Sequence, residues 1–107
     1  MTEKGKQELL QRVKELLAEA YGDRLQGVIL YGSEARGEAE PESDLDFMAI
    51  LEGPFDYGEE LSKIIHVLYP LQLEVLRPLD VMPVERKVFE AGQYAVYRNA
   101  QAEGIRA

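Results

Sequence analysis

The sequence predicts a small α/β (α+β) domain in which helices pack on a β-sheet. Three observations support this fold class: an amphipathic helical pattern near the N-terminus, a β-forming apolar run directly after it, and two further strand-like segments separated by a second helical pattern. The chain has 107 residues, of which 46% are hydrophobic, so it can bury one core and is too short for two. We therefore expect residues 1–107 to form one domain.

The N-terminal half predicts a helix, a strand, a loop and a second strand. Apolar residues recur at three- and four-residue spacing over residues 6–21, and Gly22-Asp23 then provides a stop signal. Residues 25–31 form a short run of β-formers that predicts a buried strand. Residues 32–43 contain two glycines and a proline and are predicted to be a loop. Residues 44–51 begin with alternating polarity and become continuously apolar, as expected for a strand that enters the core from solvent.

The C-terminal half predicts a helix, a short strand and a helical tail. Helical spacing resumes at residues 61–76, and Pro70 is expected to kink or divide that helix. Residues 79–84 predict a third strand, and the proline within it suggests a position at the edge of the sheet. The tail, residues 85–107, is predicted to be helical in two pieces with a break near Gly92.

Charge and composition exclude several classes of partner and location. Twenty acidic and twelve basic residues give a formal net charge of −8, which repels a long nucleic acid. No run of residues has the length and apolarity of a membrane span or a secretory signal, and we expect no membrane association. The absence of cysteine excludes disulfides and thiolate zinc sites, and a reducing cytoplasm is the simplest compartment.

Two features at strand ends suggest a phosphate- and metal-binding site. Gly32-Ser33 directly follows a predicted strand, where a glycine allows close approach of the backbone to a ligand. Asp44 and Asp46 are two residues apart at the start of a strand, so both carboxylates project on one face, and divalent cations usually offset such repulsion. Each feature alone also fits a structural role: Ser33 as a helix N-cap in an ordinary turn, and Asp44 in a solvated strand end.

A third carboxylate would complete a two-metal site. Asp80 lies in the third predicted strand, and if that strand neighbours the second, its side chain can join the first two around metals roughly 3.5–4 Å apart. Glu74 is the alternative, but the residues around it fit a helix better than a strand. Bound cations would also explain how so acidic a protein could hold an anionic triphosphate.

These residues carry a family resemblance. Gly32-Ser33, followed after ten residues by Asp44-Leu45-Asp46-Phe47, resembles the signature of the polymerase-β-type nucleotidyltransferase superfamily. Residues 31–37 (YGSEARG) and 42–46 (ESDLD) are similar to the motif of its minimal nucleotidyltransferases. The composite is far more specific than its parts. The resemblance extends from the leading helix to residues 97–105, which are like the family's usual C-terminal helix and closing glycine.

The resemblance implies the fold and chemistry of that superfamily, with a mixed sheet and with ATP and two Mg²⁺ ions as substrate and cofactor. An acceptor oxygen would attack the α-phosphorus of the nucleotide. Arg36 would lie near the phosphates, although it could instead brace the loop by pairing with Glu34 or Glu42. By the same resemblance, the catalytic and metal-binding residues would be Asp44, Asp46 and Asp80, and the nucleotide-binding residues would be Gly32, Ser33 and Arg36.

The resemblance also implies a protein partner. Larger relatives hold the acceptor in a second domain, for which this chain has no room, and minimal members typically occur with a helical HEPN-type ribonuclease as a toxin–antitoxin pair. The enzyme would then be an adenylyltransferase that modifies a tyrosine of the toxin, in a homo- or hetero-oligomeric assembly. The alternative is a non-catalytic antitoxin or nucleotide-binding module that blocks its partner by contact. Modification of a small molecule is a third and less favoured possibility.

Overall fold

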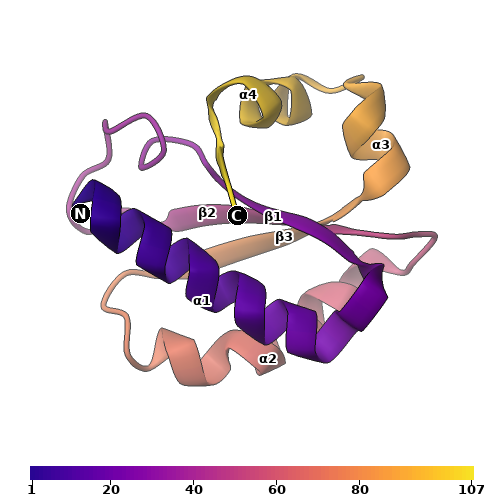
Figure 1. The fold of residues 1–107 in the computed structure, drawn as a ribbon, viewed down its shortest axis with the longest axis horizontal. Coiled ribbons are helices and arrows are strands. Elements are labelled where there is room, and N and C mark those ends of the chain that lie inside the picture. Colours follow the sequence, from indigo (N-terminus) through magenta and orange to yellow (C-terminus); the bar gives the residue numbers. More distant parts are fainter.

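A four-stranded mixed sheet forms the centre of the protein in the computed structural model, which describes residues 1–107 (Figure 1). Its strands and helices run in the order α1 (Glu3–Tyr21), η1 (Gly22–Arg24), β1 (Leu25–Tyr31), β2 (Leu45–Leu51), α2 (Tyr57–Gln72), β3 (Leu79–Glu85), α3 (Arg86–Ala91), α4 (Ala95–Glu103) and β4 (Ile105–Arg106). The strand order in the sheet is β3-β2-β1-β4.

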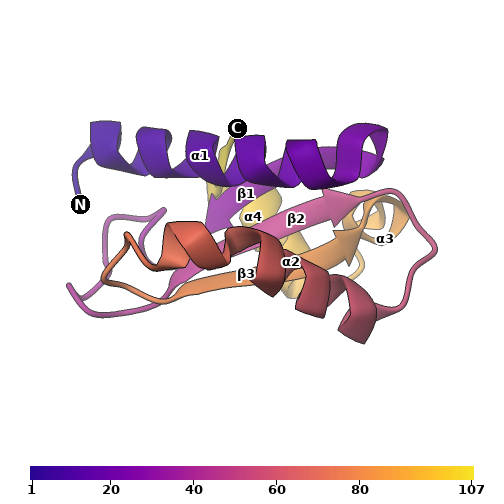
Figure 2. The ribbon, with the colours of Figure 1, turned by 90° about the horizontal axis from the view of Figure 1, so that it is seen from below.

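The directions of the strands determine which strand ends lie at the same end of the sheet. β1 is antiparallel to both β2 and β4, whereas β2 and β3 are parallel and are joined by α2 (Figure 2). The end of β1 therefore lies beside the start of β2, and the start of β3 lies on the other side of β2 at the same end of the sheet. This end of the sheet is where Gly32 and the predicted carboxylates occur in the sequence.

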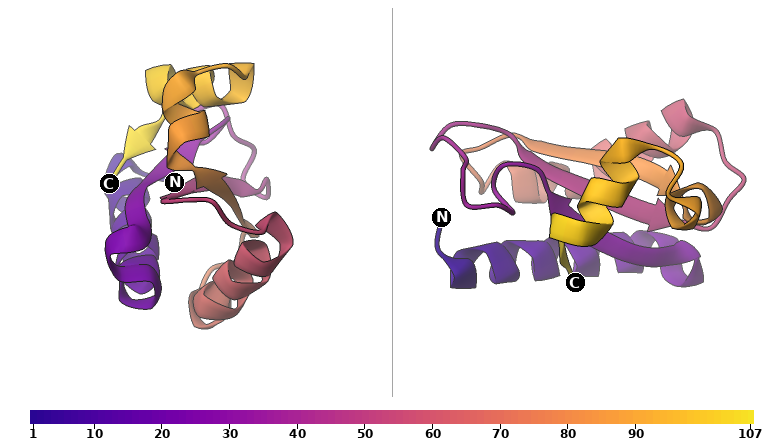
Figure 3. Two further views of the ribbon diagram at one scale, coloured as in Figure 1. Left: turned by 90° about the vertical axis from the view of Figure 1, so that its right-hand side faces the viewer. Right: turned by 90° about the horizontal axis from the view of Figure 1, so that it is seen from above.

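The two faces of the sheet are covered by different pairs of helices. α1 and α2 pack on one face, and α3 and α4 lie on the other (Figure 3). The larger core, on the α1 and α2 side, includes Phe47 and Leu51 of β2, which are fully buried. A smaller cluster on the opposite face joins Met48 to Phe89 of α3 and Ala100 of α4. The alternation of β2 side chains between these cores explains why residues 45–51 are apolar throughout.

α1 is an amphipathic surface helix. The Thr2 hydroxyl accepts a hydrogen bond of 2.9 Å from the Gly5 N–H and caps its first turn. Its buried side is the predicted stripe, with Leu10, Val13 and Leu17 almost inaccessible to solvent. Neither this helix nor any other in the structure combines the length and apolarity needed to cross a bilayer.

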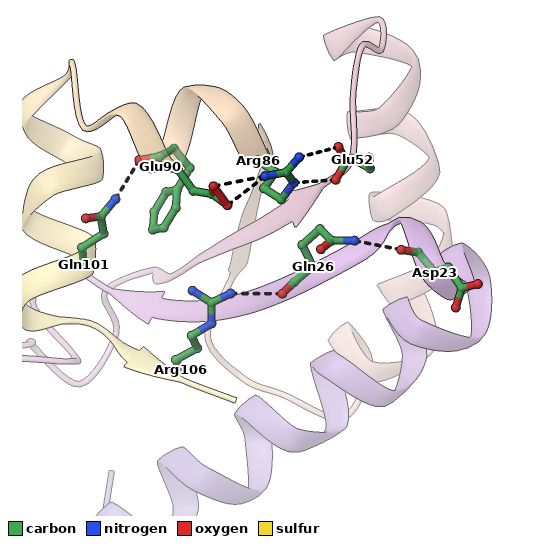
Figure 4. A network of polar contacts seen from close by, with 8 residues as sticks. Asp23, Gln26, Glu52, Arg86, Glu90, Gln101 and Arg106 are labelled. Carbon is green, nitrogen blue, oxygen red and sulfur yellow. Dashed lines mark hydrogen bonds and ion pairs between the residues drawn. The ribbon is translucent and has the colours of Figure 1, made fainter.

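Ion pairs attach the C-terminal elements to the sheet (Figure 4). Arg86 at the start of α3 donates two hydrogen bonds, of 2.6 and 2.9 Å, to Glu52, directly after β2, and also binds Glu90. Arg106 of β4 donates a 3.0 Å hydrogen bond to the carbonyl oxygen of Gln26 in β1. These contacts connect the start of α3 to the residue after β2, and β4 to its neighbour β1.

Most predicted elements are confirmed, with two differences. The position of β3 at the edge and the division of the tail into two helices near Gly92 agree with the structure. The predicted continuation of the second helix to Leu76 is wrong, because α2 ends at Gln72, and Pro70 stands inside its last turn. The Gln72 side chain accepts from the Leu79 N–H at 2.7 Å, which binds the end of the helix to the start of β3. The short strand β4 was not predicted.

Gly104, between α4 and β4, is expected to be intolerant of a larger side chain. A Cβ there would meet the Ala100 carbonyl oxygen and would lie 2.5 Å from Ile29 Cγ2. We expect Gly104→Ala to lower the free energy of unfolding by about 1–3 kcal/mol through overpacking, measured by urea denaturation. Gly58→Ala is the control, since its Cβ would only approach Asp56 Oδ1 at 3.5 Å. Equal stability of both variants would contradict this packing argument.

Candidate active site

The predicted carboxylates lie at the end of the sheet where β1 finishes and β2 and β3 begin. Asp46 is the second residue of β2 and is in parallel register with Asp80 of β3 and in antiparallel register with Tyr31 of β1. Since side chains alternate along a strand, Asp46 and Asp80 share the face of Met48 and Met82. Asp46 is half-buried, whereas Asp80 and Asp44 are exposed.

The electrostatics show that these groups act on one another. Burial raises the pKa of the Asp46 carboxyl above its ordinary value, and the negative charges of Asp80 and Asp44 raise it further. Burial also raises the pKa of Tyr31 to about 12, with added contributions from Asp46 and Asp80. The end of the sheet therefore carries an uncompensated negative charge that a cation would stabilise.

The donor set suits a divalent cation, although the three carboxylates are not drawn into one cluster. No group of three or more histidine and acidic side chains in the structure has the arrangement of a formed metal site. Like charges favour separation of the carboxylates, and carboxylate oxygens are the ligands that Mg²⁺ prefers. The chemistry of these carboxylates suits such an ion, and the register of the sheet places Asp46 beside Asp80.

Gly32 makes the bend that follows β1. Its φ of +78° is in the left-handed region, and a Cβ at this position would lie 2.8 Å from Asp46 Oδ2. The next residues form hydrogen-bonded turns, in which the Arg36 N–H donates to the Gly32 carbonyl at 3.3 Å and the Glu38 N–H donates to the Ser33 carbonyl at 2.8 Å. Only a glycine allows the backbone to pass so close to the Asp46 carboxylate. Ser33 is the next residue after this glycine.

Arg36 extends from this loop towards α4. It pairs with Glu38 at 3.3 Å and with Glu103 of α4 at 3.6 Å. The alternative in which Arg36 pairs with Glu34 or Glu42 is therefore wrong in its partners. A cleft of about 310 Å³ opens between the loop and the helix, and its lining includes Gly32 and Arg36. The volume lies within the range of small-molecule sites.

Glu74 does not belong to this region. It is exposed in the turns after α2, and its carboxylate accepts hydrogen bonds of 3.1 and 3.2 Å from Arg12 of α1. This pairing lowers the pKa of Glu74. Of the two candidates for the third carboxylate, Asp80 is the one beside Asp46.

Two buried charged residues, Lys6 and Glu34, and a largely buried arginine, Arg77, lie near the site and were not predicted to be shielded from solvent. Glu34 lies between Lys6 of α1 and Arg77, which precedes β3. One signal in the sequence could have identified Lys6, because it falls in helical phase with Leu9 and Leu10 on the apolar side of α1. No periodicity distinguishes Glu34 or Arg77, since both lie in loops.

Comparison with known proteins identifies the family and the fold. A chain of a structure described as a toxin–antitoxin with AMP-PNP is 18% identical and superposes with a TM-score of 0.57 over 91% of this chain and 70% of its own. A chain of the MntA–HpeT toxin–antitoxin with a tyrosine-to-alanine substitution is 15% identical, with a TM-score of 0.59 over 91% and 69% of the two chains. At these identities the likeness concerns the fold alone. No curated protein matches the chain. The model of the nucleotidyltransferase domain family matches residues 7–104, which is almost the whole chain, and the protein therefore belongs to that family.

Proposed function

We propose that the protein transfers AMP from Mg-ATP to a tyrosine of a HEPN-type ribonuclease and so acts as its antitoxin. The observation that carries this proposal is the register of Asp46 with Asp80, next to the Gly32 bend at the same end of the sheet. Family membership supports the nucleotidyl chemistry. The likeness in fold to chains of toxin–antitoxin structures, and a net charge of −8 that would favour a basic partner, support the choice of acceptor.

The residues would divide the work of binding and proton transfer. Asp44, Asp46 and Asp80 would hold two Mg²⁺ ions, which supply activation of the acceptor oxygen and neutralisation of the leaving pyrophosphate. The backbone of Gly32 and the hydroxyl of Ser33 would bind the triphosphate, and Arg36 would exchange its carboxylate partners for phosphate oxygens. Two of these groups, Arg36 and the Gly32 backbone, line the 310 Å³ cleft.

The reaction balances as a simple substitution at phosphorus. The tyrosine oxygen of the acceptor attacks the α-phosphorus of ATP, the bond between the α- and β-phosphates breaks, and pyrophosphate leaves. The proton of the tyrosine passes to the exposed carboxylate of Asp80, which as a strand-edge residue is open to an approaching protein.

The test is to incubate the protein with the HEPN-type partner and Mg-ATP and to weigh both proteins by mass spectrometry. We expect an AMP-sized increment on the partner, located on a tyrosine by peptide mapping. Asp80→Asn should abolish the increment, whereas Glu74→Gln, which removes a carboxylate that pairs with Arg12 outside the site, should leave it unchanged.

Two results would contradict the proposal in different ways. A partner that is inhibited but keeps its mass would establish the contact-only antitoxin in place of the enzyme. An increment that disappears in Glu74→Gln and persists in Asp80→Asn would show that the third carboxylate has been assigned to the wrong residue.

A further inference from the structure

Three paired charges, two buried and one largely buried, lie beneath the loop that follows β1. The side chains of Lys6 and Glu34 are 4% and 6% exposed, and that of Arg77 is 11% exposed. Lys6 Nζ lies 3.8 Å from Glu34 Oε2, and the Arg77 guanidinium pairs with the other oxygen of the same carboxylate. Charges so well shielded from water cost stability unless they are paired, so the Glu34 carboxylate depends on its two cationic partners. Lys6 also donates a 3.0 Å hydrogen bond to the exposed Glu3.

Arg77 connects the two ends of the loop that carries the site. Its contact with Glu34 lies two residues beyond Gly32. Its Nε donates to the Ser43 carbonyl at 2.8 Å, and another nitrogen of the same guanidinium donates to the Ser43 hydroxyl at 3.1 Å. Ser43 directly precedes Asp44. One side chain thus fixes the distance between the glycine bend and the first carboxylate.

The backbone of Arg77 is in turn fixed to the start of β3. Gln72 donates to the Arg77 carbonyl at 3.0 Å and accepts from the Leu79 N–H. The Leu45 N–H donates to the Pro78 carbonyl at 2.9 Å, which joins the first residue of β2 to the residue before β3. Arg77 therefore lies at the point where the segments bearing Gly32, Asp44 and Asp80 meet.

We propose that Arg77 is a positioning residue for nucleotidyl transfer, acting through Glu34 and Ser43 to hold the phosphate-binding bend at the correct distance from the metal-binding carboxylates. This inference rests on the proposed function. It needs an arginine, because only the planar guanidinium offers donors to the Glu34 carboxylate and to both Ser43 oxygens at once. A lysine would preserve the charge opposite Glu34 and lose the simultaneous contact with Ser43.

The test compares Arg77→Lys with the wild type in two measurements. The first is binding of Mn²⁺ with AMP-PNP by calorimetry, and the second is the rate of AMP transfer as a function of Mg²⁺ concentration. We expect Arg77→Lys to weaken Mn²⁺ and nucleotide binding and to lower kcat by about 10-fold, the scale seen for groups that orient metal ligands. The Mg²⁺ requirement should rise while KM for the acceptor protein stays constant. Ser43→Ala should show a smaller effect of roughly threefold, as for one hydrogen bond.

Arg12→Lys is the matched control, because Arg12 also forms a two-nitrogen pair with a glutamate but lies on the surface away from the site. It should bind and react like the wild type. All variants are compared well below their melting temperatures, since a loss of folded protein would lower the maximal rate without changing the Mg²⁺ requirement. Wild-type binding and kinetics in Arg77→Lys would overturn this inference alone. Failure of the wild type to bind Mn²⁺ and AMP-PNP would overturn the proposed function and this inference with it.

Discussion

Asp46→Asn is expected to abolish AMP transfer while leaving the protein folded and more stable in the absence of metal. Asp46 lies on the strand between β1 and β3, opposite Tyr31 on one side and Asp80 on the other. Its carboxylate is therefore the central one of the proposed site. Loss of groups that only orient a metal ligand costs 10- to 100-fold in activity, so loss of a ligand itself should exceed about 100-fold. The near-isosteric amide keeps the packing and removes the charge. The measurement is the rate of AMP incorporation at saturating Mg-ATP.

The expected gain in stability follows from the direction of the Asp46 pKa. Burial and the charges of Asp80 and Asp44 hold the pKa of this carboxyl above its ordinary value in the folded protein. The folded state then binds the proton more tightly than the unfolded state, so the ionised carboxyl destabilises the fold above the folded pKa, and the penalty disappears as the pH falls below the ordinary value. The Tm of Asp46→Asn should exceed that of the wild type at neutral pH, and the difference should shrink in mild acid.

In the presence of magnesium and nucleotide, the Tm of the wild type should exceed that of Asp46→Asn. Binding to the folded wild type raises its Tm by mass action, and the asparagine variant should show little such rise. Full activity of Asp46→Asn would remove this residue from the catalytic set. A Tm equal to that of the wild type at every pH would show that the carboxylates do not strain the metal-free fold.

Gly32→Ala is expected to be the second most damaging substitution for activity. The new Cβ would lie 2.8 Å from Asp46 Oδ2, so the bend and the carboxylate would have to move apart. The positive φ of +78° adds a backbone strain of about 1–2 kcal/mol for a residue other than glycine. We expect nucleotide binding to become too weak to measure. The rate of AMP transfer should fall by at least about 10-fold, as it does when a group that orients a metal ligand is lost.

Gly37→Ala separates the two causes. Gly37 has nearly the same φ, +76°, in the same loop, but a Cβ there would meet nothing within 4 Å. Both variants should therefore lose similar stability in urea denaturation, and only Gly32→Ala should lose nucleotide binding by calorimetry. An equal loss of activity in the two variants would mean that backbone strain in the loop causes the loss. The close approach of residue 32 to Asp46 would then have no separate effect on activity.

The parts of the fold that could be predicted are those whose secondary structure is specified by residues close together in the sequence. The stripe of α1, the apolar run of β1 and the half-polar entry of β2 each specify their own secondary structure, and the proline in β3 indicated an edge position. The family resemblance of the GS and DLD motifs implied that Gly32 and Asp46 belong to one site, and the structure brings the two residues together. Asp80 could be chosen over Glu74 because its neighbours are those of a strand.

The parts that could not be predicted depend on contacts between distant segments. β4 has two residues and is a strand only because Ile105 and Arg106 pair with β1. α2 ends at Gln72, and the side chain of this residue accepts a hydrogen bond from Leu79, seven residues along the chain. The partners of Arg36 could not be deduced from the loop alone, since Glu103 approaches from a helix near the other end of the chain. Glu34 and Arg77 were missed for the same reason.

The parallel pairing of β2 with β3 has a consequence for the order of folding. β1 and β2 adjoin in the chain and can form their antiparallel pair early, whereas Asp80 reaches Asp46 only after α2 has formed and crossed back along the sheet. The residues of β1 and β2 also precede Asp80 in the chain, so they are synthesised before the last carboxylate. A chain interrupted at that stage would bury part of its core and still be unable to bind a metal-chelated nucleotide, so catalytic competence would be the final property the molecule acquires.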